Sequence, residues 1–179
     1  MRNINAWLFT TLDGVVEAPE KWVHSDEEMF AAIEADYAGA DALLLGRRTY
    51  EIFAGSWPAR GNDVPNAEWM NTTRKYVAST TLRSPQWQNT TVIEGDLAET
   101  LTGLKAAPGK NLMVNGSATL VRSLMRADLL DELRLFVHPV VVGSGTRLFD
   151  DAIHADLTLT HTKAYPSGVV SLTYRPADA

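Results

Sequence analysis

An anion-binding turn is the first chemistry that the sequence suggests. In residues 43–51, Leu-Leu-Leu-Gly-Arg-Arg-Thr-Tyr-Glu, an apolar run meets Gly46 and then two adjacent arginines. The run is typical of a buried strand, and the residues after the glycine predict a helix over residues 47–53. Because a helix start is locally positive, Arg47 and Arg48 need a nearby anion, and a phosphate would also bind the free N–H groups there. Pairing with Glu51 or surface carboxylates is the alternative interpretation.

Hydroxyl groups follow two other strand-like runs. Ser79 and Thr80 come directly after one of them and could hydrogen-bond a phosphate ester, although an ordinary Ser/Thr turn is the more common reason for such a sequence. Gly116 and Ser117 follow the other run, before a helix that starts at Ala118. Because the carboxyl ends of parallel strands meet at one edge of a sheet, the three turns predict one crevice for a ligand with several phosphates, such as a dinucleotide.

Other site chemistries find less support. Neither G-x-G-x-x-G nor G-x-x-x-x-G-K-[ST] occurs, and Gly143-Ser144-Gly145 lacks the third glycine of a Rossmann fingerprint. The four histidines are far apart and the chain has no cysteine, so we expect no metal site. The sequence also lacks a G-x-S-x-G nucleophile turn, which argues against a hydrolase.

Composition predicts one soluble domain. The 179 residues, 45% of them hydrophobic, can bury one sizeable core, so we expect a single domain over residues 1–179. A net charge of −6 and a pI near 5.2 argue against general nucleic-acid binding. The sequence shows neither a signal-peptide pattern nor an apolar run of membrane-spanning length, so we expect a cytoplasmic protein without a membrane partner.

Alternating strand and helix patterns must position the three turns. Strand-like runs occur at residues 3–12, 42–45, 76–78, 91–93, 112–114, 133–142, 157–164 and 169–174. Helical patterns cover residues 25–37, 96–104 and 118–126, and the first opens with a Ser25-x-x-Glu28 capping box. Residues 55–73 are typical of an irregular surface excursion with one helical turn around Trp69. Together they predict an α/β fold, with a mostly parallel central sheet flanked by helices and a C-terminal antiparallel hairpin.

These motifs, in this order, resemble the dihydrofolate reductase superfamily, and more closely its branch with the reductase domain of riboflavin biosynthesis, the RibD C-terminal domain. The matching segments span nearly the whole chain and are Thr11-Leu12-Asp13-Gly14, Leu45-Gly46-Arg47-Arg48-Thr49-Tyr50-Glu51, Val77-Ala78-Ser79, Val114-Asn115-Gly116-Ser117-Ala118, Asp128-Leu129-Leu130-Asp131-Glu132-Leu133, Pro139-Val140-Val141-Val142-Gly143-Ser144-Gly145 and Leu148-Phe149. The resemblance implies a dihydrofolate reductase-like three-layer fold and NADPH-dependent reduction of a small-molecule substrate.

The resemblance also implies a set of cofactor-binding residues. The segment Gly46-Arg47-Arg48-Thr49 is similar to the Gly-Arg-x-Thr segment that meets the cofactor phosphates. Ser79, with Thr80 beside it, is similar to the element that meets the adenosine 2′-phosphate, which favours NADPH over NADH. Gly116 and Ser117 resemble the Gly-Gly step beside the nicotinamide and pyrophosphate, with serine in place of the second glycine. The neighbouring residues Asn115, Ala118 and Thr119 complete the expected cofactor-binding set. We expect ordinary backbone angles at Ser117, since only these would let serine replace glycine.

Three acidic residues, Asp26, Glu27 and Asp13, are the candidate proton donors for such a reduction, and water is the alternative donor. Asp26 precedes Phe30 by one helical turn, which resembles the acid and aromatic pair that folate reductases present to the pterin. An acid that complements the helix dipole is the more common reason for aspartate at this position. Asp13 and Gly14 lie where the family places the loop that closes over the nicotinamide.

Two departures from the family leave the substrate open. Folate reductases carry a threonine on the strand that corresponds to residues 133–137, which have no hydroxyl here, and riboflavin-pathway reductases usually read Glu-Gly-Gly where this chain reads Asn115-Gly116-Ser117. We therefore predict an NADPH-dependent reductase that transfers hydride to a C=N or C=O acceptor, of the dihydrofolate reductase or 5-amino-6-(5-phosphoribosylamino)uracil reductase type.

Two other classes of function stay open. One is an NADPH-binding relative without turnover, acting as a sensor or structural protein, and the other is an assembly module with no nucleotide affinity. Residues 133–142 are apolar on both faces and suit either a central strand or a homodimer seam. Since the riboflavin-type branch is known for dimers, we expect a homodimer.

Overall fold

The fold is built on one eight-stranded sheet, seen in a computed structural model that describes residues 1–61, 63–149 and 153–177. The strand order is β4-β3-β2-β5-β1-β6-β8-β7. The strands are β1 Ile4–Thr11, β2 Ala40–Gly46, β3 Arg74–Ala78, β4 Thr90–Ile93, β5 Asn111–Asn115, β6 Glu132–His138, β7 Leu157–Ala164 and β8 Val170–Pro176. Strands β1 to β6 pair in parallel, whereas β8 runs antiparallel to both β6 and β7. This confirms the predicted mostly parallel sheet with a C-terminal hairpin.

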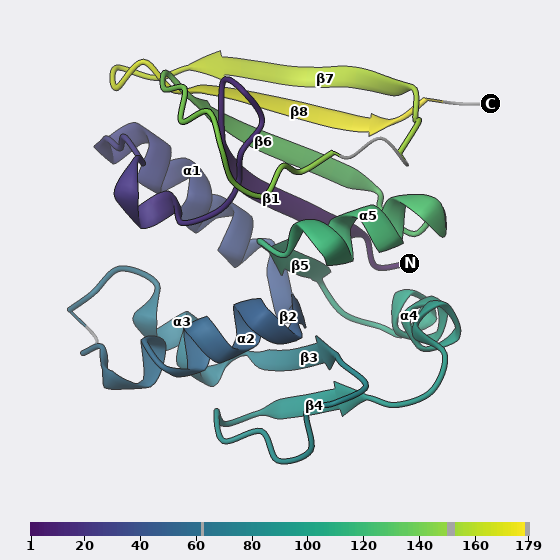
Figure 1. Cartoon of the computed structure of the whole chain (residues 1–179). Helices are drawn as coiled ribbons and strands as arrows, with labels where there is room; N and C mark the ends of the chain where they lie inside the picture. The colour runs from purple at the N-terminus through teal and green to yellow at the C-terminus, as the bar shows by residue number, and fades with distance from the viewer. Residues whose placement is uncertain (62, 150–152, 178–179) are drawn as a thin grey trace.

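Helices cover the two faces of this sheet and make three layers (Figure 1). Helices α1 Glu27–Ala38, α2 Arg47–Ala54 and α3 Ala67–Thr72 pack on one face, where Met29 and Ile33 of α1 join a buried cluster with Trp7 and Phe136. Helices α4 Leu97–Ala106 and α5 Ala118–Arg126 cover the other face through side chains such as Leu124. Each helix buries an apolar stripe because its apolar residues recur every three or four positions.

Two predicted boundaries are wrong, each for a local reason. Helix α1 is capped by Asp26, whose carboxylate accepts the Met29 N–H, so the predicted capping box at Ser25 does not form. Strand β6 ends at His138 rather than at residue 142, because Pro139 has no N–H to pair and the Val140 N–H turns back to the His138 carbonyl oxygen (2.7 Å). Within residues 132–138, β6 is a central strand between β1 and β8.

The excursion between α2 and β3 is less regular than the rest of the fold, as predicted. It holds the short 3₁₀ helix η2, Trp57–Ala59, and helix α3, which contains Trp69. A second 3₁₀ helix, η1, covers Pro19–Lys21 between β1 and α1. Across the described residues, each helix is too short or too polar to cross a membrane.

Candidate functional site

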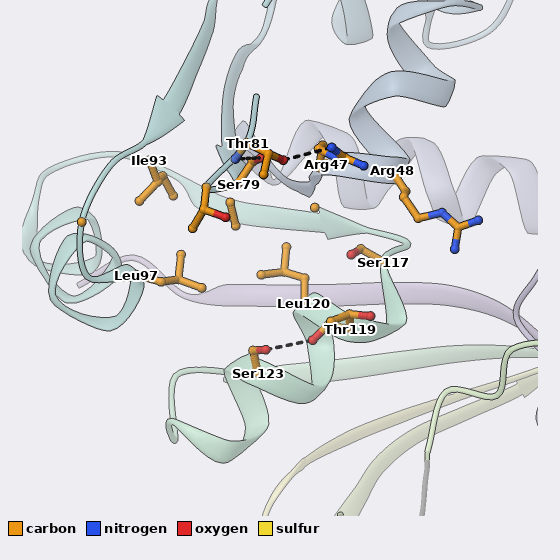
Figure 2. A pocket seen from close by; sticks show the side chains of 14 residues that line it. Arg47, Arg48, Ser79, Thr81, Ile93, Leu97, Ser117, Thr119, Leu120 and Ser123 are labelled. Atoms are coloured by element: carbon orange, nitrogen blue, oxygen red, sulfur yellow. Dashed lines mark hydrogen bonds between the residues drawn. The ribbon is translucent and has the colours of Figure 1, made fainter. Parts of the chain in front are cut away.

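The three turns singled out in the sequence line one cleft at the carboxyl edge of the parallel strands, between the start of α2 and the start of α5 (Figure 2). The cleft has a volume of about 480 Å³. Its lining residues are Gly46, Arg47, Arg48, Ala78, Ser79, Thr80, Thr81, Ile93, Gly95, Leu97, Ser117, Thr119, Leu120 and Ser123. The lining carries two guanidinium groups, several hydroxyls and no carboxylate, which suits a ligand with phosphate groups.

Gly46 lets the ends of β2 and β5 approach each other. Its φ of −78° is open to any residue, so the glycine is not needed for its backbone conformation. A Cβ atom at this position would instead collide with the Ser117 hydroxyl and lie 3.2 Å from the Ser117 Cβ. The glycine therefore makes room for Ser117, and the two turns interlock across the cleft.

The two arginines extend in different directions from the first turn of α2 (Figure 2). Arg47 Nη1 donates to the Thr81 hydroxyl oxygen at 3.0 Å, which holds the guanidinium beside the turn after β3. The same arginine lies 3.6 Å from Glu51, so the pairing considered from the sequence is also present, between half-exposed side chains. The Arg48 side chain points away from Arg47. The arginines thus place positive charge at two separate positions on the cleft.

Arg48 also faces the loop that follows β1. The pKa of the Glu17 carboxyl is lowered chiefly by hydrogen bonds from the Thr146 hydroxyl and N–H, and the charge of Arg48 adds to this effect. The Glu17 carboxylate therefore connects the loop after β1 to the segment around Thr146 through these hydrogen bonds. Arg48 therefore lines the cleft and is also close enough to the loop after β1 to affect the charge on Glu17.

Ser79 keeps a hydroxyl proton available to the cleft. Its oxygen accepts the backbone N–H groups of Thr81 and Leu82 at 3.2 and 3.0 Å, which makes the predicted Ser/Thr turn. Because these contacts use only the acceptor side of the hydroxyl, the O–H can still donate to a ligand. The turn and the phosphate-binding interpretations are therefore compatible.

The turn after β5 differs from the sequence prediction. Gly116 has a φ of 76°, and Ser117 also lies in the left-handed region at φ 62° and ψ 76°. The expectation of ordinary backbone angles at Ser117 is therefore wrong. Ser117 is the N-cap of α5, yet its side chain makes no capping hydrogen bond. Its hydroxyl faces the cleft instead (Figure 2).

Four of the predicted cofactor-binding residues lie near the cleft without lining it: Thr49, Asn115, Gly116 and Ala118. Thr49 packs beside Gly116, whose added Cβ would lie 3.5 Å from the Thr49 methyl group. Asn115 is buried on the α1 side of the sheet, where its amide donates to the Tyr37 hydroxyl oxygen at 2.6 Å. The cofactor roles of these residues stay predictions.

Sequence reasoning missed the part of the cleft wall that β4, α4 and the second turn of α5 contribute, most of which is apolar. Ile93 ends β4, Leu97 begins α4, and Leu120 and Ser123 extend the α5 wall. The wall residues of α5 recur every three or four positions from Ser117, so the helix period could have predicted them. Ile93 and Leu97 read as ordinary core residues, because their place beside the cleft depends on the pairing of β4 with β3.

The Asp13 carboxylate holds its loop against the segment after β6. It accepts hydrogen bonds from the Thr11 hydroxyl (2.6 Å) and the Gly143 N–H (2.8 Å), and Arg147 lies 4.0 Å away. The Thr11 hydroxyl is the largest cause that lowers the pKa of Asp13, and the backbone N–H groups of Gly143 and Val142 add to it. These contacts favour a structural role, and proton donation by Asp13 stays a prediction.

Asp26 joins the start of α1 to the C-terminal hairpin. Its two carboxylate oxygens accept the backbone N–H groups of Met29 and Ser167, each at 2.9 Å. The nearby Ser167 side chain is the largest cause that lowers the pKa of Asp26, and the backbone N–H groups add to it. Phe30 is 46% exposed, so it does not close a pocket against Asp26. Glu27 is exposed at the first position of α1, and the donor roles of both acids stay predictions.

A buried histidine lies near the start of α1, at the end of β6. His138 is fully buried at the end of β6, and its Nδ1 accepts the His24 N–H at 3.0 Å. Phe9 and Trp22 contact its ring edge-on. Burial lowers the pKa of His138 to about 4, so the imidazole is neutral at pH 7 and its proton is on Nε2.

Comparisons with known proteins agree with the fold and the motif order. The family model described as RibD C-terminal domain matches residues 2–171. The uncharacterized protein YyaP from Bacillus subtilis (strain 168) is 32% identical over 183 residues, which cover 97% of this chain and 94% of YyaP.

Two solved structures share the fold at lower identity. A putative riboflavin biosynthesis protein from Shewanella sp. PV-4 is similar with a TM-score of 0.75 and 20% identity, over 99% of this chain and 100% of that one. A dihydrofolate reductase from Enterococcus faecalis, complexed with NADP(H), is similar with a TM-score of 0.65 and 14% identity, over 98% and 97% of the two chains.

Proposed function

The chain belongs to the RibD C-terminal domain family, and we propose that it is an NADPH-dependent reductase that transfers hydride to a C=N or C=O acceptor. The observation that carries the proposal is the shared cleft, in which three strand-end turns bring Arg47, Arg48 and the Ser79 and Ser117 hydroxyls to one place. Structural neighbours include a 5-amino-6-(5-phosphoribosylamino)uracil reductase from Thermotoga maritima and a dihydrofolate reductase complexed with NADP(H). A cleft with converging cations and hydroxyls but no lining carboxylate fits a dinucleotide with an additional phosphate.

Different residues of the cleft are assigned to different phosphate groups of NADPH. We assign Arg47, Ser79 and Thr80 to the adenosine 2′-phosphate, because the Arg47 guanidinium is already held beside the turn after β3. Arg48, Ser117 and Thr119 would hold the pyrophosphate at the opposite part of the cleft. Thr49, Asn115, Gly116 and Ala118 shape the turn behind it. Bound NADPH would supply the hydride, and the protein would hold the cofactor against the acceptor.

The substrate belongs to the pteridine or riboflavin-pathway pyrimidine class in this proposal. Asp13, Asp26 and Glu27 are the proposed proton donors, but hydrogen bonds keep the first two ionised and engaged in loop contacts. Asn115 carries a neutral amide, and one N–H of this amide already donates to the Tyr37 hydroxyl oxygen. This arrangement favours protonation of the reduced acceptor by water that one of these acids orients.

The same observations support a second candidate function, an NADPH-binding sensor or structural protein without turnover. Asn115 cannot donate a catalytic proton, and Asp13 and Asp26 are used in structural contacts. The two functions predict the same cofactor affinity, and they differ only in whether an acceptor is reduced.

The test is NADPH oxidation by the purified chain with dihydrofolate, the riboflavin-pathway ribosylaminopyrimidine, small quinones and imines. Acceptor-dependent oxidation that exceeds the no-enzyme control supports the reductase. NADPH binding without oxidation by any acceptor favours the sensor, and a chain that does not bind NADPH would contradict both.

A further inference from the structure

Residues 79–89 join β3 to β4 without a helix or a strand of their own. Because the two strands are parallel, this 79–89 connection must run back from the carboxyl edge of the sheet to the amino edge. Its first three residues line the cleft. In the described part of the chain, one backbone-to-backbone hydrogen bond reaches the connection, from the Lys75 N–H to the Asn89 carbonyl oxygen (2.8 Å). Side chains must therefore hold the rest of it in place.

Helix α2 contacts the 79–89 connection at two points, one turn apart. Arg47 Nη1 donates to the Thr81 hydroxyl oxygen at the cleft (3.0 Å, Figure 2). Three residues further along the helix, the Tyr50 hydroxyl oxygen accepts the Trp87 N–H at 3.1 Å. Because residues three apart lie on the same side of a helix, both contacts are made by the side of α2 that faces the connection.

The two contacts differ in their exposure. The Arg47 side chain is 47% exposed, and a bound phosphate would compete with Thr81 for its guanidinium group. Tyr50 and Trp87 are each 3% exposed, and neither lines the cleft. The buried contact therefore holds the 79–89 connection whether or not Arg47 binds a ligand.

Trp87 is also bound to α3 and β3. Its Nε1 donates to Asn71 Oδ1 at 2.9 Å, and the Lys75 ammonium lies 4.2 Å from the centre of its ring. The same ammonium donates to the Gln88 carbonyl oxygen at 3.2 Å. These contacts hold the far end of the 79–89 connection, and the Tyr50 hydroxyl links that end to the helix that carries Arg47.

We propose that Tyr50 is a positioning residue, whose buried hydroxyl fixes the 79–89 connection on α2 and thereby sets the place of Ser79 and Thr80 beside Arg47. The inference rests on the proposed function and deepens it, because it assigns part of the selectivity for NADPH over NADH to a residue outside the cleft. NADH lacks the 2′-phosphate that Arg47, Ser79 and Thr80 are proposed to bind. A displaced connection therefore weakens the binding of NADPH and leaves that of NADH unchanged.

Tyr50→Phe tests the inference because it keeps the ring and removes the hydroxyl. It leaves the Trp87 N–H buried without an acceptor, so the Tm should fall. In the absence of ligand, we expect faster amide hydrogen exchange in residues 79–89. In calorimetric titrations, the affinity for NADPH should fall about tenfold, the effect of losing one hydrogen bond to a charged group, while the affinity for NADH stays within about twofold of wild type.

Tyr165→Phe is the matched control, because Tyr165 is another buried tyrosine, and its hydroxyl lies 3.5 Å from the Ser171 hydroxyl in the C-terminal hairpin. Exchange in residues 79–89 and the ratio of NADPH to NADH affinity should match wild type in this control. A Tyr50→Phe chain with the wild-type ratio would overturn the inference. Equal losses of affinity for NADPH and NADH would also overturn it, since they would identify a general loss of structure.

Failure of the proposed function gives a different result. A wild-type chain that binds neither cofactor would contradict the reductase, whereas faster exchange in residues 79–89 of Tyr50→Phe would still support the anchoring role of Tyr50. A wild-type chain that binds NADPH and NADH equally would overturn the assigned selectivity. Unchanged exchange in Tyr50→Phe would overturn the anchoring role, whatever the cofactor titrations give.

Discussion

At the scale of single residues, the carboxylates of the candidate proton donors Asp13 and Asp26 are better suited to hold the structure than to deliver a proton. Asp13 and Asp26 each accept at least two hydrogen bonds, and these bonds lower the pKa of both groups. A general acid needs a pKa near the working pH, which hydrogen bonds to the ionised form oppose. The two aspartates therefore join segments of the chain to each other, and neither lines the cleft.

Asp26→Asn tests this interpretation. The asparagine oxygen can still accept the Met29 N–H, but its amide group would face the Ser167 N–H in place of an acceptor. We expect a lower free energy of unfolding, with NADPH affinity unchanged and acceptor reduction within severalfold of wild type. Glu34→Gln, at an exposed position of the same helix that is not among the candidate donors, serves as the control. A hundredfold loss of kcat with intact stability would instead identify Asp26 as the proton donor.

His138 predicts a pH dependence of stability. Its folded-state pKa is about 4, below the value near 6.5 of an unfolded histidine. Between these values the unfolded chain binds a proton that the folded chain does not, so stability falls as the pH is lowered through this window. We expect a loss of about 2–3 kcal/mol between pH 6.5 and pH 4.

His138→Asn isolates this contribution in urea unfolding at several pH values. Asparagine can keep an acceptor for the His24 N–H but does not titrate. The variant should have lower stability at neutral pH and a shallower decline toward pH 4. Equal slopes for the two proteins would mean that the pKa of His138 is the same in the folded and unfolded chains, which would contradict the burial effect.

At the scale of elements, the cleft depends on how closely β2 and β5 end beside each other. A methyl group at Gly46 would collide with the Ser117 side chain, so Gly46→Ala should lower the free energy of unfolding by about 1–3 kcal/mol. With Ser117→Gly in the same chain, the next contact is Leu120 Cβ at 3.9 Å, an ordinary packing distance. We therefore expect the double variant to recover most of the loss.

Denaturant unfolding of the two single variants and the double variant measures this coupling as a double-mutant cycle. Additive effects, with no recovery in the double variant, would contradict the interlocked turns. The cycle uses stability alone, so its outcome does not depend on any ligand.

Most elements could be predicted from periodicity, whereas their ends could not. Helix α5 follows its predicted range because its apolar residues recur regularly and Gly116 interrupts the pattern before it. The end of β6 depends on a turn at Pro139, although the apolar run continues through Val142. The left-handed backbone at Ser117 could not be predicted from the residue type, and the only sign of it is the glycine that the family pattern has at this position.

The glycines, arginines and hydroxyl groups of the candidate site could be predicted from the sequence. Glycines, arginines and hydroxyls after strands mark anion-binding turns, and the shared edge of a parallel sheet brings them together. The direction of each side chain could not be predicted in this way. Arg47 and Arg48 are adjacent in sequence, yet they extend to different parts of the cleft.

At the scale of the whole molecule, the hairpin leaves an open edge. Strand β7 ends the sheet, and all of its residues after Leu157 are exposed. An edge strand of eight residues with exposed sides is a natural place for a second copy to pair. We keep the prediction of a homodimer and place its contact at β7, since β6 lies inside the sheet.

Sedimentation of Leu159→Glu tests the dimer. Leu159 is 48% exposed on β7, so a charge there should shift a dimer to monomer at micromolar concentration while the fold is retained. Leu12→Glu, at a leucine that is 65% exposed in the loop after β1 and is not part of β7, should leave the association unchanged. A wild-type chain that sediments as a monomer, or two variants with equal behaviour, would contradict this contact.

The central claim is that three strand-end turns together bind NADPH. Calorimetric titration with NADPH, for the wild type and for the variant in which Arg47→Ala and Arg48→Ala are combined, tests it most directly. We predict one NADPH per wild-type chain and a loss of about 1.5–3 kcal/mol of binding free energy for each arginine removed, with an unchanged melting temperature in the absence of ligand. A wild type that takes up no NADPH, or a variant that binds it as tightly as the wild type, would contradict the account.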